Sequence, residues 1–569
     1  MKNKIRYLYS VLKESKGSFL IFVLILSFFI LFLFYPLVYI FYNTFFVNGK
    51  FTFDYVRLML SDPLYVEAMK NSLTIATIST IITLCVGVPL AVLFARYDFP
   101  NRAVFQGLLL APMVMPPFVG AIGLQKIFAR YGAINIFLKD WLHLIERPID
   151  WLGGGFWGII ILEVIHLYPI VYLNAIAALA NIDPTLEETA EILGAKGIRL
   201  FLTITFPLML PGVIAGGTIV FIWAFTDLGT PLIFNYKKVI PVLIFDMTRQ
   251  IYTNPMGYAL SFLVLVIATV AFLLIREYVS LRRYEMLGRG HIASRVYKIS
   301  GLKGLLINVF LILFLILALM PHISVILTSI AEEWFMSVLP ERYTGRFYFE
   351  VFRHSLTITG IKNSLLYSSL STLLDIALGV AIAYICLRSK IPGRGLLDIL
   401  AMWPLALPGI IIAFGYLTTF SDTMFDPRTN PVPLLVLCYA VRRLPYSVRA
   451  IYAGLQQVHI ALEEAAQVLG AKPLKVIKDI TVPLIMANIL AGGILSFSQA
   501  MLEVSSSLVL AMHEKEYPIS KVIYELYGRL RDGPYIASAM GVLGMLLIIA
   551  ALLIANRVLG RRMGELFRA

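Results

Sequence analysis

The fold of this chain is decided by a stretch that occurs twice. The first copy reads Glu187-Glu188-Thr189-Ala190-Glu191-Ile192-Leu193-Gly194-Ala195-Lys196, followed by Ile204-Thr205-Phe206-Pro207. The second reads Glu463-Glu464-Ala465-Ala466-Gln467-Val468-Leu469-Gly470-Ala471-Lys472, followed by Ile480-Thr481-Val482-Pro483, at a constant offset of 276 residues. Each copy predicts a short polar helix with one apolar face, formed in the first copy by Leu186, Ala190 and Leu193. Gly194 and Gly470 stand where a helix ends by turning left-handed.

The composition is that of a membrane protein. The chain has 569 residues, 59% hydrophobic and 14% charged, with a mean hydropathy of +0.82. These values predict an all-α polytopic membrane protein that lies in a lipid bilayer. The net charge of +14 invites a nucleic-acid partner. Basic residues outnumber acidic ones mainly in the predicted cytoplasmic segments, however, which is the positive-inside pattern, so we expect no nucleic acid.

Apolar runs predict 12 membrane spans in two halves. Residues 1–276 and 304–569 each hold six spans, and the basic segment 277–303 is predicted to join them in the cytoplasm. The first apolar run is too long for a signal peptide and lacks a cleavage site, so we expect a retained span and cytoplasmic termini. The expected spans are 19–42, 72–94, 103–124, 155–180, 203–226, 257–276, 304–328, 364–386, 397–420, 431–455, 484–511 and 535–556.

The repeat extends beyond the duplicated stretch. Lys70-Asn71-Ser72-Leu73 matches Lys362-Asn363-Ser364-Leu365 at an offset of 292 residues. The fall from 292 to 276 places 16 extra residues between Gly123 and Glu188, in an outside loop of the first half. Because each half has an even number of spans, the two repeats are predicted to be parallel, related by an axis along the membrane normal.

Charged residues within predicted spans are candidates for the transport path. Asp227 and Glu503 align at offset 276. They could form an acidic ring at the outer gate, or be helix-end acids hydrogen-bonded to loops. The basic residues Arg442, Arg443 and Arg449 could attract an anion, pair with Asp375, or mark the inner end of a helix. Two further acids, Glu163 and Asp375, lack acidic counterparts, and we expect both to be satisfied inside the bundle.

Prolines interrupt the third and the ninth span at corresponding places. Such breaks either line a substrate path or serve only packing. The candidate pathway residues are therefore Asp227, Glu503, Arg442, Pro116 and Pro408. Cys85, Cys386 and Cys438 all lie in apolar spans and suggest neither disulfides nor a metal site. The sequence contains no phosphate-binding loop and no evident catalytic triad, so we expect no enzyme activity and no cofactor.

The duplicated stretch, near 183–207 and 459–483, resembles the EAA loop of ABC-type importer permeases. The resemblance implies the type I permease fold, an inner-membrane location, two ABC ATPase subunits on the cytoplasmic side, and an external solute-binding protein. ATP hydrolysis would then reside in a separate chain. An ion-coupled secondary transporter of two parallel halves is the rival from another class, but it has no ATPase to receive such loops. The implied ATPase-coupling residues are Glu187, Glu188, Ala190, Gly194, Glu463, Glu464, Ala466 and Gly470.

The likeness is greatest to fused two-repeat permeases of the ferric-iron type, which are related to thiamine and phosphonate permeases. It rests on Thr226-Asp227-Leu228-Gly229-Thr230-Pro231, similar to the Asp-Phe-Gly-Thr-Pro of iron permeases, with Leu228 in place of Phe, and on Leu502-Glu503. The resemblance implies import of ferric iron. Thiamine, phosphonate and polyamine remain alternative solutes, because such importers take specificity largely from the binding protein.

Overall fold

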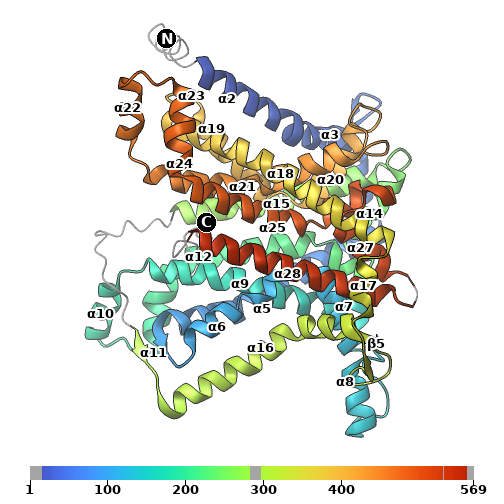
Figure 1. Cartoon of the computed structure of the whole chain (residues 1–569). Helices are drawn as coiled ribbons and strands as arrows, with labels where there is room; N and C mark the ends of the chain where they lie inside the picture. Colours follow the sequence, from blue (N-terminus) through green and yellow to red (C-terminus); the bar gives the residue numbers. More distant parts are fainter. Residues whose placement is uncertain (1–15, 282–295, 530, 560–569) are drawn as a thin grey trace.

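The computed structural model of the protein describes residues 16–281, 296–529 and 531–559. These residues form a helical bundle, which confirms the predicted all-α class (Figure 1). Strand structure in the described ranges is confined to three two-stranded pairs, β1–β2, β3–β4 and β5–β6. Most of the basic residues predicted for the linker and for the two ends of the chain lie outside the described residues.

The helices of the chain are grouped by its two predicted halves. The first half runs through α2 (Lys16–Phe29), η1 (Ile30–Phe34), α3 (Tyr35–Phe45), α4 (Asp54–Ser61), α5 (Pro63–Arg96), α6 (Arg102–Leu108), η2 (Ala111–Val114), α7 (Pro117–Phe128), α8 (Ala133–Ile136), η3 (Phe137–Trp141), η4 (Gly153–Gly155), α9 (Phe156–Ala180), α10 (Pro184–Ile192), α11 (Gly197–Leu200), η5 (Phe201–Thr205), α12 (Phe206–Thr226), α13 (Gly229–Ile233), α14 (Ile240–Met247), η6 (Thr248–Gln250) and α15 (Met256–Leu281).

The second predicted half begins with α16. Its helices are α16 (Gly301–Ile330), α17 (Arg346–Val351), α18 (Ser355–Arg388), α19 (Arg394–Met402), η7 (Trp403–Leu405), α20 (Gly409–Phe420), α21 (Val432–Gln457), α22 (Ile460–Val468), α23 (Pro473–Val476), η8 (Ile477–Thr481), α24 (Val482–Leu484), α25 (Met486–Met501), α26 (Ser505–Leu510), η9 (Glu514–Glu516), α27 (Ile519–Tyr527) and α28 (Gly533–Leu559). The axis that relates the halves stays a prediction.

The candidate spans number one fewer than the predicted 12 when each bent helix pair is counted as one span. Eight helices of the described chain are long and apolar enough to cross a membrane, and up to 11 qualify if each bent pair forms one span. The remaining predicted span is α21, which is 26 residues long but carries Arg442, Arg443 and Arg449. Helix α21 is therefore the span that apolar composition alone identifies least well.

Two of the bent pairs lie at the predicted prolines. The helices before and after Pro116 meet at 97°, and those before and after Pro408 meet at 103°. Pro116 and Pro408 each immediately precede the second helix of the pair, α7 and α20. Proline lacks the N–H that would continue a helix, and it restricts the preceding residue. The sequence thus predicted both breaks correctly.

The two halves interlock through their first helices. Helices α2 and α3 of the first half pack against α18, α19 and α20 of the second, and α16 of the second half packs against η2 and α7 of the first. Figure 1 shows this exchange, with α2 beside α19 and α16 beside α6. Hydropathy does not predict the exchange, because a span that is apolar on every side gives no sign of which helix it contacts.

Glycines at equivalent positions allow these first helices to approach closely. A Cβ on Gly123 in α7 would overlap the backbone oxygen of Pro321 in α16. A Cβ on Gly415 in α20 would lie 3.1 Å from the Cβ of Pro36 in α3. Each contact is accompanied by a hydrogen bond between the halves: Ser324 Oγ donates to the Gly123 oxygen at 2.8 Å, and Tyr416 Oη donates to the Phe32 oxygen at 2.6 Å.

We expect Gly123→Ala to destabilise the protein more than Gly415→Ala. The added methyl group meets backbone at Gly123 and a side-chain carbon at Gly415, and overpacking typically costs about 1–3 kcal/mol. Thermal unfolding in detergent measures the difference. Gly107→Ala in α6 is the control, because its Cβ would meet no atom within 4 Å. Equal melting temperatures for Gly123→Ala and Gly107→Ala would contradict the close contact.

Candidate coupling loops and translocation pathway

The two EAA loops have the same backbone structure. Helices α10 and α22 each end in a residue with positive φ, +94° at Gly194 and +88° at Gly470. The next N–H in each loop donates back to the carbonyl of the fifth residue before it, Ala195 to Ala190 at 2.9 Å and Ala471 to Ala466 at 3.0 Å. These bonds complete a Schellman motif, in which glycine avoids the strain that a Cβ would cause. The predicted helix ends at both glycines are confirmed.

The N-terminus of α10 is capped by an aspartate. Asp183 Oδ1 accepts hydrogen bonds from the Thr185 backbone N–H at 2.9 Å and from the Thr185 hydroxyl at 2.8 Å. These donors hold the pKa of Asp183 below its usual value. In the second loop His459 takes this place, its Nδ1 accepting from the Ala461 N–H at 3.3 Å.

The first glutamate of each duplicated stretch is bound to the helical bundle. Glu187 accepts from Arg96 Nη2 at 2.5 Å and from Thr205 Oγ1 at 2.7 Å. The second copy repeats the arrangement, with Glu463 bonded to Arg388 Nε at 3.1 Å and to Thr481 Oγ1 at 3.1 Å. We call these two sets of residues the glutamate clasps. Each clasp joins the EAA loop to the end of the long helix α5 or α18 and to the start of the next long helix.

The second clasp has additional bonds. Arg388 Nη2 also donates to the backbone oxygens of Leu455 at 3.1 Å and Val458 at 2.8 Å, at the end of α21. All four charged side chains of the clasps are nearly buried, with 4–12% of their surface exposed. In the sequence, Arg96 and Arg388 stand out only as a residue repeated in the two halves. Their repetition together with the glutamates was the signal that could have revealed the clasps.

The remaining surface of each loop is exposed and apolar at its tip. Ile192 and Leu193 are 85% and 83% exposed, and Val468 and Leu469 are 86% and 88% exposed. Glu188 and Glu464 are also exposed, whereas Ala190 is buried and Ala466 half-buried. Of the apolar face predicted from Leu186, Ala190 and Leu193, the bundle covers only Ala190, and the two leucines are exposed. Two apolar tips remain available for another protein.

The two intramembrane acids both cap a short helix. Asp227 accepts from the backbone N–H groups of Gly229 at 3.2 Å and Thr230 at 3.0 Å, at the start of α13. Glu503 accepts in the equivalent place from the Ser506 N–H at 3.3 Å, at the start of α26. Of the two interpretations left open by the sequence, hydrogen bonding to the following segment is the one the structure shows.

Glu503 is paired with two arginines of α21. Its Oε1 forms an ion pair with Arg442 Nη1, and its Oε2 lies 2.6 Å from Arg443 Nη2. Of the alternatives considered for these arginines, pairing with Asp375 is not seen among the described residues, because Arg442 and Arg443 both bind Glu503. Asp375 is fully buried near Ser496 and Arg443, but neither carboxylate oxygen has a well-formed hydrogen bond among the described residues. Inside the bundle this acid interacts with Ser496 and Arg443. Arg449 instead points its Nε at Met402 Sδ, at 3.0 Å.

The first half has a different set of neighbours around its acid. The carboxyl of Glu163 is hydrogen-bonded to Asp227, and its Oε1 has no other partner in the described chain. His166 lies near Asp227 and its Nδ1 is 3.1 Å from the Pro112 oxygen. His166 occupies the position that Arg442 has in the second half, at offset 276. Without arginine partners, the first half is the more acidic side of the pathway region.

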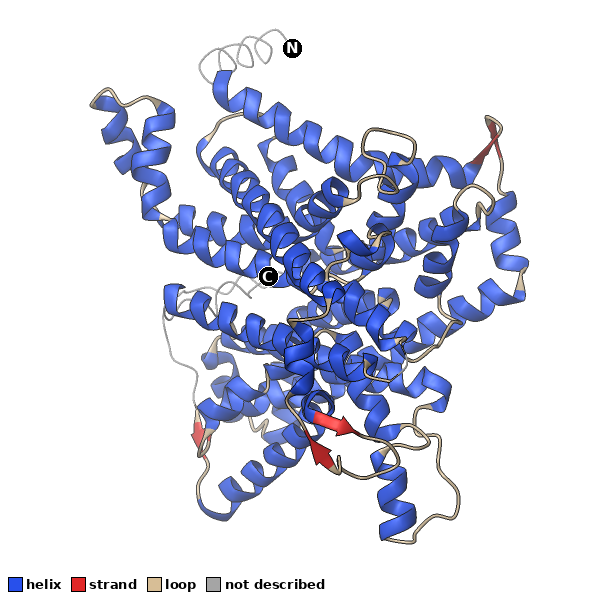
Figure 2. Cartoon of the chain, turned by 45° about the vertical axis from the view of Figure 1, so that its right-hand side comes forward, coloured by secondary structure: helices blue, strands red, loops and turns tan. Residues whose placement is uncertain are grey.

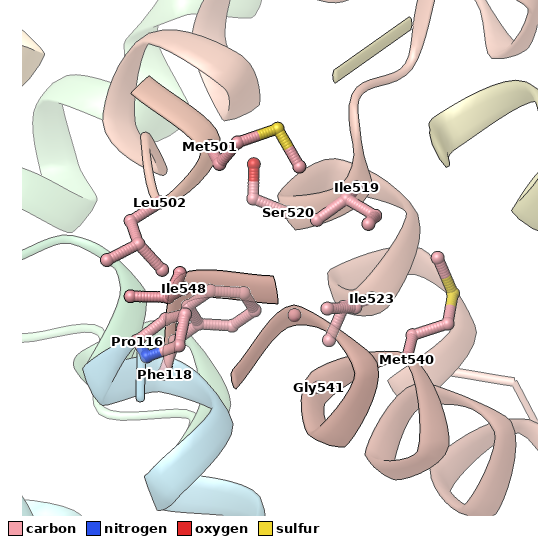
Figure 3. A pocket seen from close by; sticks show the side chains of 11 residues that line it. Pro116, Phe118, Met501, Leu502, Ile519, Ser520, Ile523, Met540, Gly541 and Ile548 are labelled. Carbon is pink, nitrogen blue, oxygen red and sulfur yellow. The ribbon is translucent and has the colours of Figure 1, made fainter. Parts of the chain in front are cut away.

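A small cavity lies where the halves meet beside these acids. It has a volume of about 20 Å³, and Figure 3 shows Pro116 and Phe118 of the first half facing Met501 and Leu502 of the second. The lining is apolar apart from Ser520, whose hydroxyl donates to the Glu503 backbone oxygen at 2.7 Å. Such a volume holds about one water molecule. The predicted pathway residue Pro116 borders the cavity, and Pro408 does not.

We expect Glu503→Gln to destabilise the protein strongly. It removes the charge that compensates two nearly buried arginines, and breaking a buried pair typically costs about 3–5 kcal/mol. Asp227→Asn is the matched control at the equivalent position, where the amide oxygen can still accept a backbone N–H. The measurement is the melting temperature of the purified protein in detergent. A fall at Glu503→Gln no larger than at Asp227→Asn would argue against the arginine pairs.

Metal ligands do not cluster in the described part of the chain. No group of three or more His, Cys, Asp or Glu side chains there is arranged to hold a metal ion. The three cysteines are all unpaired.

Comparison with known proteins gives consistent results for the whole chain. Residues 87–281 and 375–565 match the family described as "Binding-protein-dependent transport system inner membrane component". The chain is 26% identical over 554 residues to the ferric transport system permease protein FbpB of Actinobacillus pleuropneumoniae, covering 96% of this chain and 78% of the relative. It is 34% identical over 172 residues to the spermidine/putrescine transport system permease protein PotB of Escherichia coli K12, covering 30% of this chain and 61% of the relative.

Solved structures match one half of the chain. A crystal structure of a bacterial ABC transporter involved in the import of alginate covers 49% of this chain and 99% of its own, with 19% identity and a TM-score of 0.39.

Proposed function

Because the chain belongs to the family of inner-membrane components of binding-protein-dependent transport systems, we propose that it forms the complete translocation pathway of a ferric-iron importer. The observation that carries the proposal is the pair of EAA loops, each with an exposed apolar tip and a buried glutamate clasp. Each loop would receive one ABC ATPase subunit. The EAA loops and both chain termini would then face the cytoplasm, and an external binding protein would deliver the solute to the opposite end.

The clasps support a mechanical role for the loops. An ATPase that moves α10 or α22 also moves Glu187 or Glu463, and through them the arginine at the end of α5 or α18. The threonine of each clasp, Thr205 or Thr481, lies on the segment that leads into α12 or α25. Those helices end at Asp227 and Glu503 beside the closed cavity. ATP binding would stabilise one of two conformations of the pathway, and ATP hydrolysis would allow the return to the other.

Ferric iron is supported by the name of the relative that matches nearly the whole chain. The charged side chains beside the cavity support ferric iron in the first half only. Asp227 and Glu163 offer the hard oxygen atoms that a ferric ion prefers, whereas the Glu503 charge is compensated by Arg442 and Arg443. Of the symmetric acidic ring considered from the sequence, only the acids of the first half therefore remain without arginine partners.

Other solutes correspond to other features of the same pathway. A polyamine is suggested by the PotB relative, and a cationic amine would also favour the Asp227 side. Phosphonate or another anion would need the second half, where two arginines share one glutamate. Thiamine remains an alternative, and its positively charged thiazolium ring would also favour the Asp227 side.

We expect Leu193→Glu combined with Leu469→Glu to abolish ATP-driven uptake. Both leucines are more than four-fifths exposed, so the fold should be unaffected, while two charges would enter an apolar contact with the ATPase. Co-purification of the ATPase and the uptake rate should fall together. Met424→Glu is the control, because Met424 is 89% exposed and lies far from both EAA loops in sequence. Unchanged co-purification in the double variant would refute docking at these tips.

We expect Glu163→Gln combined with Asp227→Asn to slow iron uptake without uncoupling ATP hydrolysis. Neutralising these two carboxylates should lower the uptake of radiolabelled iron by roughly tenfold or more, which corresponds to about 1.4 kcal/mol. Uptake is measured in vesicles that contain the permease, its ATPase and its binding protein. Glu67→Gln is the control, since Glu67 forms only an exposed ion pair with Lys238. Normal iron uptake by the double variant would overturn the ferric assignment and leave the family assignment standing.

A further inference from the structure

The 16 extra residues of the first half form a projection from the bundle. They lie between the end of α7 at Phe128 and the start of α9 at Phe156, and they include α8 and η3. Figure 1 shows α8 running across the direction of the long helices, at the end of the bundle opposite to α10 and α22. Figure 2 shows the same segment and its long loop extending away from the bundle. We call residues 129–155 the lateral loop.

A single buried asparagine holds the lateral loop closed. Asn135 Nδ2 donates to the backbone oxygens of Ala129 at 3.2 Å, Arg130 at 3.2 Å and Ile149 at 2.8 Å. Its Oδ1 accepts from the Ile149 N–H at 3.1 Å and from Trp151 Nε1 at 3.0 Å. These five bonds tie the two ends of the loop together, and Asn135 is only 1% exposed. The lateral loop is therefore held closed at its base.

The tip of this element is apolar and fully accessible. Trp141 is 68% exposed and Leu144 is 69% exposed. The other exposed apolar side chains of the lateral loop are Tyr131, Phe137, Leu142, Ile149 and Trp151. Charged residues of both signs lie among them: Lys139, Asp140, Glu146 and Arg147. An apolar patch rimmed by charges, held rigidly away from the bundle, marks a surface that is covered by something else.

The composition and position of the tip indicate that it contacts lipid. Tryptophan and tyrosine are enriched where a membrane meets water, because their rings combine an apolar body with a polar edge. A segment that lies across the long helices at one end of the bundle lies in the plane of that interface. A binding protein that delivers solute would sit over the junction of the halves near Gly229 and Val504, not at this lateral edge.

We propose that the lateral loop is a membrane-interface anchor, with Trp141, Leu142 and Leu144 inserted among the lipid headgroups at the bundle end opposite to the EAA loops. The anchor belongs to the first half alone. In the second half, residues 421–431 replace it with a short loop fastened by Arg428 to Asp422 at 2.6 Å and to Asp426. That loop exposes Met424, which therefore provides a matched position without an anchor.

A nitroxide label at Leu144→Cys tests the proposal in the full-length protein. The three native cysteines are first replaced by alanine, and the protein is placed in nanodiscs of phosphatidylcholine and phosphatidylglycerol. We expect the label at residue 144 to favour collisions with oxygen over a water-soluble nickel chelate about threefold more than a label at Met424→Cys, because oxygen concentrates in lipid. Equal ratios at the two positions would show that the tip lies in water and would overturn the proposal.

Two further measurements distinguish a lipid anchor from a loosely held loop and from a protein-docking surface. Asn135→Ala should increase the mobility of the label at residue 144 and lower its oxygen preference, since the loop loses all five closing bonds. An unchanged spectrum would mean that the loop is not held as we propose. Solute-loaded binding protein is then added. If the label is aqueous without it and becomes immobile with it, the tip is a protein-docking surface, and the lipid proposal is wrong.

Discussion

A buried ion pair at the base of each EAA loop is the interaction on which the rest of the arrangement depends. A charged side chain is costly to remove from water unless a partner compensates it, so Glu187 and Glu463 must stay with Arg96 and Arg388 wherever the loop moves. The loop tip is exposed and apolar, and its base is charged and fixed. In the proposed function, that division would let a short polar helix bind an ATPase at one side and transmit its displacement to membrane helices at the other.

The exchange of first helices joins the two halves to each other. Each half is covered by a helix that begins the other half, through contacts at Gly123 with Pro321 and at Gly415 with Pro36. When one half rotates, the first helix of the other half, which packs against it, must move with it. In a single chain with both repeats, such interlocking joins the two EAA loops to one bundle and favours a concerted change of both halves.

Repetition of the fold does not extend to its charges. The position of Arg442 is occupied by His166 in the first half, and Glu163 lies beside Asp227 in place of an arginine. One side of the pathway region is therefore acidic, and the other has two arginines around one glutamate. A duplicated backbone with unequal charges can offer a passing ion different ligands on its two sides. The lateral loop adds a second asymmetry, at the surface.

The sequence by itself determined the features that depend on local order. The two repeats, the helix ends at Gly194 and Gly470, and the breaks before α7 and α20 follow from residues that are adjacent in the chain, because glycine and proline act on their own backbone. Tertiary structure alone decided which charges meet. Arg442 could reach Asp375 or Glu503, and only the rotation of α21 about its axis selects Glu503. The order of residues along α21 does not say which neighbouring helix its arginines face, and spans that are apolar on all sides do not say which helix they contact, so helix exchange, clasps and cavity emerge only once the helices are packed.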